Sequence, residues 1–208
     1  MTVFAHSDSV TIVLLYRVKR GDLVIFNTRM IIPSSINGRN LNYALQAPAK
    51  VILLSGVSIG NLKGFVQAIH KQKKQAVVHI DILAGFKADD VGMHLLKNLY
   101  HLDGILTSNV RALTQGKHLG MTTVYRLPLI DSLSLAKAAD ILKNADNYDA
   151  VQVLPAICAV NETDHLKHVF MHKPLIASGL IETEDQVKLA FSAGYQFVAT
   201  SRQNLWSS

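Results

Sequence analysis

Residues 173 to 206 read KPLIASGLIETEDQVKLAFSAGYQFVATSRQNLW, and the pattern of this stretch indicates the fold of the chain. Two short strand-like runs, Pro174 to Ala177 and Gln196 to Ala199, flank a segment whose apolar residues recur at helical spacing. The polar start at Thr183 and the glycine at Gly194 mark the two ends of that helix. A strand, a helix and a second strand in this order are typical of a parallel sheet with helical connections.

Small residues follow both strands of this stretch. Ser178 and Gly179 come directly after the first strand, and Thr200 and Ser201 come directly after the second. Backbone N–H groups in such turns, together with a following helix N-terminus, form an anion cradle, which eight-stranded barrels use for phosphate after strands seven and eight. We therefore expect these four residues to bind a phosphate group. The alternative is that Gly179 only permits a turn and that Thr200 and Ser201 only cap a helix.

The chain upstream repeats the same alternation. Helical segments separate six further short strands, predicted at Met30–Pro33, Val51–Leu54, Ala76–Asp81, Gly104–Thr107, Thr122–Arg126 and Ala150–Leu154. The intervening helices are predicted near residues 43–46, 59–72, 89–100, 112–119, 134–144 and 162–170. Eight apolar strands suited to a sheet buried on both faces predict an α/β fold, a short (β/α)8 TIM-type barrel over residues 30–208. A doubly wound open sheet is the alternative, because strand order cannot be read from sequence.

Residues 1–29 form an N-terminal extension with a different pattern. Two β-prone runs, 10–18 and 23–26, flank a turn-like Lys-Arg-Gly-Asp segment without an intervening helix. Either the extension is a β-hairpin appended to the barrel or translation starts at Met30. Because an isolated two-stranded hairpin is only marginally stable, we favour the second interpretation.

Composition restricts the class of protein. With 208 residues, of which 49% are hydrophobic, the chain can bury a core without metals or disulfides. Its apolar run at 12–16 is far shorter than the roughly 20 residues of a membrane helix, so we expect a cytoplasmic protein with no membrane association. The net charge of +6 and the pI near 9.4 suit a polyanionic partner such as nucleic acid, and equally a moderately basic enzyme.

Four polar residues are predicted to line the mouth of the barrel. His79 and Asp81 lie near the end of the third strand, Arg126 ends the fifth, and Gln152 lies in the sixth. Asp81 could accept hydrogen bonds from a polyol, assisted by His79, and Arg126 could pair with a phosphate. The alternatives are a structural hydrogen bond of His79 and an internal ion pair between Arg126 and Asp81.

Catalysis has less support than binding. His79, Asp81 and Arg126 could in principle act as acids and bases on a phosphorylated substrate. However, Gln152 cannot ionise, no strand end carries the lysine of Schiff-base chemistry, and neither a metal-ligand spacing nor a GxSxG motif occurs. We therefore assign no catalytic residue, no metal and no cofactor.

Eight short motifs occur in the order and spacing of one family. They are LLSG (53–56), NLKG (61–64), HIDILAGF (79–86), DGILTSN (103–109), RLPLIDS (126–132), VLP (153–155), SGLIETED (178–185) and ATSRQNLW (199–206). Through them the chain resembles the glycerol uptake operon antiterminator regulatory proteins over residues 30–206. The resemblance implies a bacterial cytoplasmic barrel that is a regulator and not an enzyme. It also implies glycerol 3-phosphate as effector and leader mRNA as partner, with prevention of transcription termination as the outcome.

The chain departs from the family pattern at four positions. Asn109 stands where a basic residue is usual, Gln152 where an acidic residue is usual, and Ala156 and Ser178 each stand in place of a glycine. The missing cation at position 109 removes one candidate contact to a ligand or to RNA. These departures bear on the geometry of ligand binding and on ligand choice, while the fold is unaffected.

RNA contacts, if the resemblance holds, must come from a basic face, because no RRM, KH or zinc-knuckle signature occurs. The candidates are Lys71, Lys73, Lys74, Arg111, Lys117, His118 and Arg202. The alternatives are that the lysine run is a solvated helix end, and that the protein senses a phosphorylated ligand but acts through protein partners. The transcript recognised, and whether the chain forms a homo-oligomer, are left open.

Overall fold

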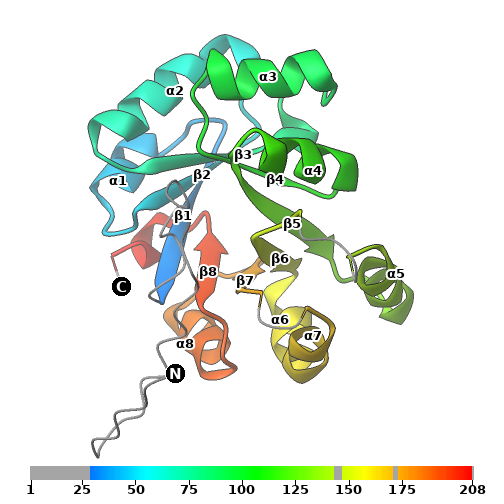
Figure 1. Cartoon of the computed structure of the whole chain (residues 1–208). Helices are drawn as coiled ribbons and strands as arrows, with labels where there is room; N and C mark the ends of the chain where they lie inside the picture. Colours follow the sequence, from blue (N-terminus) through cyan, green and yellow to red (C-terminus); the bar gives the residue numbers. More distant parts are fainter. Residues whose placement is uncertain (1–28, 143–146, 171–172, 208) are drawn as a thin grey trace, which may run out of the picture.

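Eight parallel strands close into a barrel with helices around its outside (Figure 1). The structure is a computed structural model that describes residues 29–142, 147–170 and 173–207. Strand order follows chain order, and pairing of the eighth strand with the first, with Ile31 opposite Val198, closes the sheet. The (β/α)8 barrel predicted from the sequence is thereby confirmed. Apart from Arg29, the N-terminal extension lies outside the described residues.

The strands agree with the predicted ones to within three residues at each end. They are β1 (Met30–Ile36), β2 (Val51–Ser55), β3 (Gln75–His79), β4 (Gly104–Thr107), β5 (Thr122–Pro128), β6 (Ala150–Leu154), β7 (Leu175–Ser178) and β8 (Phe197–Thr200). One difference concerns the site. The third strand was expected to reach Asp81, but β3 ends at His79 and the chain continues as a 3-10 turn, η1 (Ile80–Ile82).

The helices follow the strands in regular alternation. They are α1 (Leu41–Gln46), α2 (Ile59–Lys71), α3 (Asp90–Asn98), α4 (Val110–His118), α5 (Ser132–Leu142), α6 (Ala156–Asn161), α7 (Thr163–Phe170) and α8 (Glu184–Ser192). Polar side chains cap the N-termini of several helices by accepting a hydrogen bond from a backbone N–H group. Asp89 accepts from Gly92, Asn109 from Ala112 and Thr183 from Gln186. Within the described part of the chain, no helix has the length and apolar character needed to cross a membrane.

Two helical segments differ from expectation. The connection between β6 and β7 contains α6 as well as α7, whereas only the second was predicted. After β8, where Thr200 and Ser201 were considered as possible caps of a helix, the chain forms a three-residue 3-10 turn, η2 (Gln203–Leu205), closed by Trp206. The indole N–H of Trp206 donates to the carbonyl of Thr200 at 2.9 Å and holds this turn against the end of β8. The β8 loop is therefore fixed by a side chain, and it has no α-helix N-terminus to offer an anion.

The strands bury both faces. Outward side chains such as Ile52, Ile105 and Val151 pack under the helices in one large cluster. Inward side chains form a second cluster inside the barrel, consisting of Ile32, Val51, Leu53, Val77, Leu106, Val124, Ala150, Ile176, Phe197 and Ala199. This apolar layer fills the barrel interior below the mouth. Thr122, at the start of β5, is a polar residue in its lining, whereas the polar residues of the mouth lie at the carboxyl ends of the strands.

Two aspartates repeat one arrangement at the amino-terminal end of the barrel. Asp103, just before β4, accepts hydrogen bonds from the backbone N–H of Ala76 and from His70, both at 2.8 Å. Asp149, just before β6, accepts from the backbone N–H of Thr123 at 2.9 Å and pairs with Lys117. Each carboxylate thus ties a preceding helix to the starts of two adjacent strands.

We expect Asp149→Ala to lower the free energy of unfolding by about 1–3 kcal/mol, because it leaves the N–H of Thr123 without its acceptor. Urea unfolding would measure the change. The matched control is Asp185→Ala on α8, whose carboxylate is almost fully exposed and which should have little effect. Equal effects of the two substitutions would contradict the bracing role of Asp149.

Candidate functional site

A cavity of about 210 Å³ opens at the carboxyl ends of the strands. Every residue predicted to bind the ligand lines it except Asp81. The predicted lining residues are His79, Arg126, Gln152, Ser178, Gly179, Thr200 and Ser201. Arg126 and Gln152 are direct neighbours in the register of β5 and β6. The barrel therefore brings into one mouth residues that lie up to 122 positions apart in the sequence.

The β7 and β8 loops form one wall of this cavity. Gly179 and Leu180 both have positive φ, 77° and 58°, which turns the chain sharply after β7. Among the described residues, the backbone N–H groups of Gly179, Leu180 and Ser201 have no acceptor. A leucine in the left-handed region is strained, and such strain is concentrated at binding sites. The wall thus presents unused N–H donors, as a phosphate cradle requires.

Hydroxyl groups add to this wall, although Thr200 does not contribute as predicted. The Thr200 hydroxyl donates to the carbonyl of Ile181 at 2.9 Å and accepts from the N–H of Arg202 at 3.1 Å. It is therefore committed to joining the two loops. The hydroxyls of Ser178 and Ser201 make no hydrogen bond with any described residue and border the cavity.

Gly179 is needed for the shape of this wall. A side chain there would combine a positive φ with a Cβ only 3.2 Å from the Cβ of Leu154. The Gly179 carbonyl also accepts from the N–H of Ala156 at 3.1 Å, which joins the β6 and β7 loops. The turn at Gly179 and the unused N–H donors therefore belong to the same loop.

Asp81 lies beside the cavity and supports its wall. Its carboxylate accepts from the Thr107 hydroxyl and, at 2.9 Å, from the backbone N–H of Ser108. Burial by itself would raise the pKa of Asp81. The hydrogen bonds and the nearby His79 outweigh burial, so the pKa lies below its ordinary value. Because Asp81 does not line the cavity and its carboxylate is held by the end of β4, it is poorly placed as the predicted acceptor for a polyol.

Arg126 is half-buried in the mouth, and it forms no ion pair with Asp81 or with any other described residue. Burial lowers the pKa of its guanidinium, and the more distant charge of Asp81 opposes this shift. Within the described residues the guanidinium thus has no ion pair that would hold the barrel end together, and it is available to an external anion.

Three polar lining residues were not predicted from the sequence. Ser34 and Ser55 contribute to the cavity from β1 and β2, and Glu182 contributes from the β7 loop. Glu182 would repel a phosphate, but it forms an ion pair with Arg202 across the two loops. Ser55 carries one usable signal, since it is the only polar residue of β2.

The comparison with known families decides the relationship. The family of glycerol-3-phosphate responsive antiterminators matches residues 31–206. The chain belongs to this family. The crystal structure of the glycerol uptake operon antiterminator regulatory protein from Listeria monocytogenes is similar, with 28% identity and a TM-score of 0.80, covering 87% of this chain and 96% of that one.

Two other proteins are similar at lower identity. A glycerol uptake operon antiterminator-related protein from Thermotoga maritima has 22% identity and a TM-score of 0.75, covering 86% of this chain and 99% of that one. Protein YgcP of Escherichia coli K12 is 25% identical over 177 residues, which are 85% of this chain and 91% of YgcP. At 22% identity the Thermotoga structure supports the barrel fold alone.

The departures from the antiterminator pattern have local structural roles. Asn109 caps α4 by accepting from the N–H of Ala112 at 3.2 Å. Ala156 begins α6 and donates its N–H to Gly179. Gln152 is buried at the floor of the mouth, and Ser178 adds a hydroxyl to the β7 wall. Two of the four positions thus alter the cavity lining itself.

The predicted RNA residues do not share one face. Arg111 and Arg202 lie at the mouth end of the barrel, whereas Lys71, Lys73 and Lys117 lie at the opposite end, where helices lead into strands. Lys117 is paired with Asp149, and Arg202 with Glu182. His118, which follows Lys117, is exposed.

Lys74 corrects the prediction of a three-lysine surface. Its side chain is buried, and its ammonium donates to the carbonyls of Ala44 and Ala47, which end α1. Burial, and then repulsion from Lys50, lower its pKa. Lys74 therefore has a structural role in the loop before β3, and it is not accessible to RNA.

Proposed function

We propose that this protein binds glycerol 3-phosphate in the mouth of the barrel, and that this ligand controls its binding to leader mRNA and thereby prevents transcription termination. The proposal follows the description of its family. It places the protein in the cytoplasm, where transcripts are made, and it assigns the barrel a regulatory role without catalysis.

One observation supports the ligand site above all others. The unused N–H groups of Gly179, Leu180 and Ser201 border a cavity at the ends of β7 and β8, together with two free serine hydroxyls. Because N–H and O–H groups donate to a phosphate without requiring a cation, this wall is suited to the phosphate end of the ligand.

The same cavity favours binding over catalysis. Among the described residues that line it there is no lysine, so the mouth has no amine for Schiff-base chemistry. Gln152, at its floor, cannot act as an acid or a base. His79 and Glu182 also line the mouth, but Glu182 is paired with Arg202, so most of the polar lining consists of hydrogen-bond donors that are suited to recognition of a ligand that leaves unchanged.

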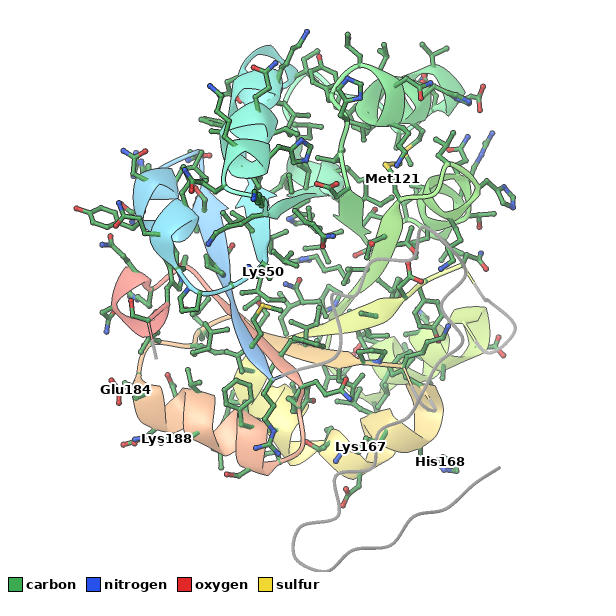
Figure 2. All side chains as sticks on the ribbon, turned by 60° about the vertical axis from the view of Figure 1, so that its left-hand side comes forward. Lys50, Met121, Lys167, His168, Glu184 and Lys188 are labelled. Atoms are coloured by element: carbon green, nitrogen blue, oxygen red, sulfur yellow. The ribbon has the colours of Figure 1, made fainter. Side chains whose placement is uncertain are left out.

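For RNA we propose the amino-terminal end of the barrel. Lys50 precedes β2, and Lys71 and Lys73 precede β3, which pairs with β2 through Val51 and Gln75. All three lysines are exposed and have no ion pair within the described part of the chain, whereas Lys188 on α8 pairs with Glu184 at 3.8 Å (Figure 2). Clustered, uncompensated cations are suited to an RNA backbone.

Removal of a hydroxyl donor tests the phosphate site. We expect Ser178→Ala and Ser201→Ala each to weaken binding of glycerol 3-phosphate about tenfold, as loss of one hydrogen bond to a charged group would do. Isothermal titration calorimetry would measure this. Ser192→Ala, at the exposed end of α8, is the control and should bind normally. Unchanged affinity in both cavity variants would place the phosphate elsewhere.

A further inference from the structure

The guanidinium of Arg126 is a cation without a partner. The side chain of Arg126 makes no hydrogen bond or ion pair with a described residue. Only its backbone carbonyl has a side-chain partner, the Ser108 hydroxyl, which donates to it at 2.9 Å. Burial lowers its pKa, which means that folding disfavours the charge. An uncompensated, half-buried charge reduces stability, so a partner from outside the chain is the simplest reason for its presence.

Asp81 does not supply that partner. Its Oδ1 is bound by the Thr107 hydroxyl and its Oδ2 by the N–H of Ser108, which fixes the carboxylate to the end of β4. Burial lowers the pKa of Arg126, and the negative charge of Asp81 opposes this by favouring the charged form, but the two side chains form no ion pair. The guanidinium therefore keeps its donor groups free for a molecule in the cavity.

A second unsatisfied group lies in the same mouth. The Nε2 atom of His79 is buried and has no hydrogen-bond partner within the described residues; it lies 3.6 Å from Oδ2 of Asp81, which is within ion-pair range but too long for a hydrogen bond. The His79 side chain is only 9% exposed. Since buried polar atoms nearly always have partners, this orphan nitrogen also indicates a ligand.

These two groups belong to strands β3 and β5, whereas the phosphate cradle belongs to the β7 and β8 loops. The cavity thus has two regions rich in donors. Arg126 has five N–H donors and no acceptor, in a fork that matches a carboxylate or a phosphate, and the phosphate of the ligand is already assigned to the β7 and β8 loops. A diol would leave most of that fork unused, because each hydroxyl offers only a single oxygen. The group that fits beside Arg126 is therefore a second anion.

We propose that the mouth accepts a three-carbon phosphate monoester that ends in a carboxylate, a phosphorylated hydroxy acid, in competition with glycerol 3-phosphate. The carboxylate pairs with Arg126 and accepts from His79, and Gln152 lies beside it. The phosphate occupies the β7 and β8 loops. This inference rests on the proposed function, because it requires the phosphate at that wall.

Calorimetry on the full chain tests the inference with 3-phosphoglycerate, glycerol 3-phosphate, glycerate and inorganic phosphate. We expect 3-phosphoglycerate to bind at least as tightly as glycerol 3-phosphate and to displace it, while glycerate and inorganic phosphate bind more weakly than either. Arg126→Gln should weaken 3-phosphoglycerate about 10- to 100-fold and glycerol 3-phosphate by less than threefold. Arg126→Lys, which keeps the charge, should recover part of the loss. Arg29→Gln, an exposed arginine just before β1 and outside the cavity, is the matched control and should change neither affinity.

Several results would overturn the inference. If glycerol 3-phosphate binds and 3-phosphoglycerate does not, the inference that the mouth binds a second anionic group is wrong, while the proposed function stands. If Arg126→Gln weakens the binding of both ligands equally, Arg126 contacts the phosphate that they share and not the carboxylate. If neither phosphate ester binds, the proposed function fails together with the inference. A ligand-free Arg126→Gln protein that melts below the wild type would assign Arg126 a structural role, since removal of an unpaired charge should leave the melting temperature unchanged or raise it.

Discussion

Glycerol 3-phosphate should stabilise this protein by about 2.7 kcal/mol at a concentration one hundred times its dissociation constant, because a ligand that binds only the folded state draws the equilibrium toward it. For a chain of this size the melting temperature should rise by roughly 5–11 °C. Glycerol at the same concentration should give no shift, because it lacks the phosphate that the β7 and β8 loops would hold. Thermal melts with the two compounds measure the difference.

Ser178→Asp makes the same experiment sharper. It places a carboxylate beside the free N–H groups of Gly179 and Leu180, where it would repel a phosphate, and we expect the stabilisation to vanish. A substitution at Gly179 would be less clean, since its positive φ and its contact with Leu154 would strain the loop. Ser192→Asp on the surface of α8 is the matched control. An equal shift with glycerol, or a full shift in Ser178→Asp, would refute the phosphate site.

RNA binding should weaken steeply as salt rises, because each phosphate contact on a single strand contributes a slope of about −0.7 in log affinity against log salt. Replacement of Lys50, Lys71 and Lys73 by glutamine should make this slope shallower by about 2 and weaken binding at low salt. Filter binding at several salt concentrations would give both quantities.

The control for this surface is a triple variant of equal charge change elsewhere. Lys87, Lys137 and Lys188 are exposed but lie on separate elements, so their replacement should leave the slope nearly unchanged. Equal effects of the two triple variants would mean that RNA binding depends only on the net charge of the protein and not on this surface. Absence of RNA binding in the wild-type protein would instead favour a ligand sensor that acts through protein partners.

Local patterns predicted the barrel well because each strand is short, apolar and bounded by small or polar residues. The loops after β7 and β8 were found by the same logic, since Gly179 and Ser201 follow the strands directly. Helix α6 was missed for a physical reason. Residues 156–160 are all apolar or small, and without a polar face they show no helical period.

Other parts of the site depend on contacts between distant residues. The burial of Lys74 is set by the carbonyls of Ala44 and Ala47, about one helix and one strand earlier in the chain. Likewise, the Thr200 hydroxyl is committed to Ile181 only because the two loops meet at the mouth. A sequence pattern shows that such groups are polar, but it does not show which partners they have, and those partners decide between a ligand contact and a structural one.

Ligand binding in the mouth is proposed to control RNA binding, and a gel shift measures this coupling. The affinity for the leader RNA of the glycerol-uptake operon from the same genome should be determined by gel shift with and without saturating glycerol 3-phosphate. We expect a change of about 5- to 150-fold in the wild type, the usual range of coupling between two sites, and none in Ser178→Asp. The same affinity with and without the ligand in the wild-type protein would contradict the account.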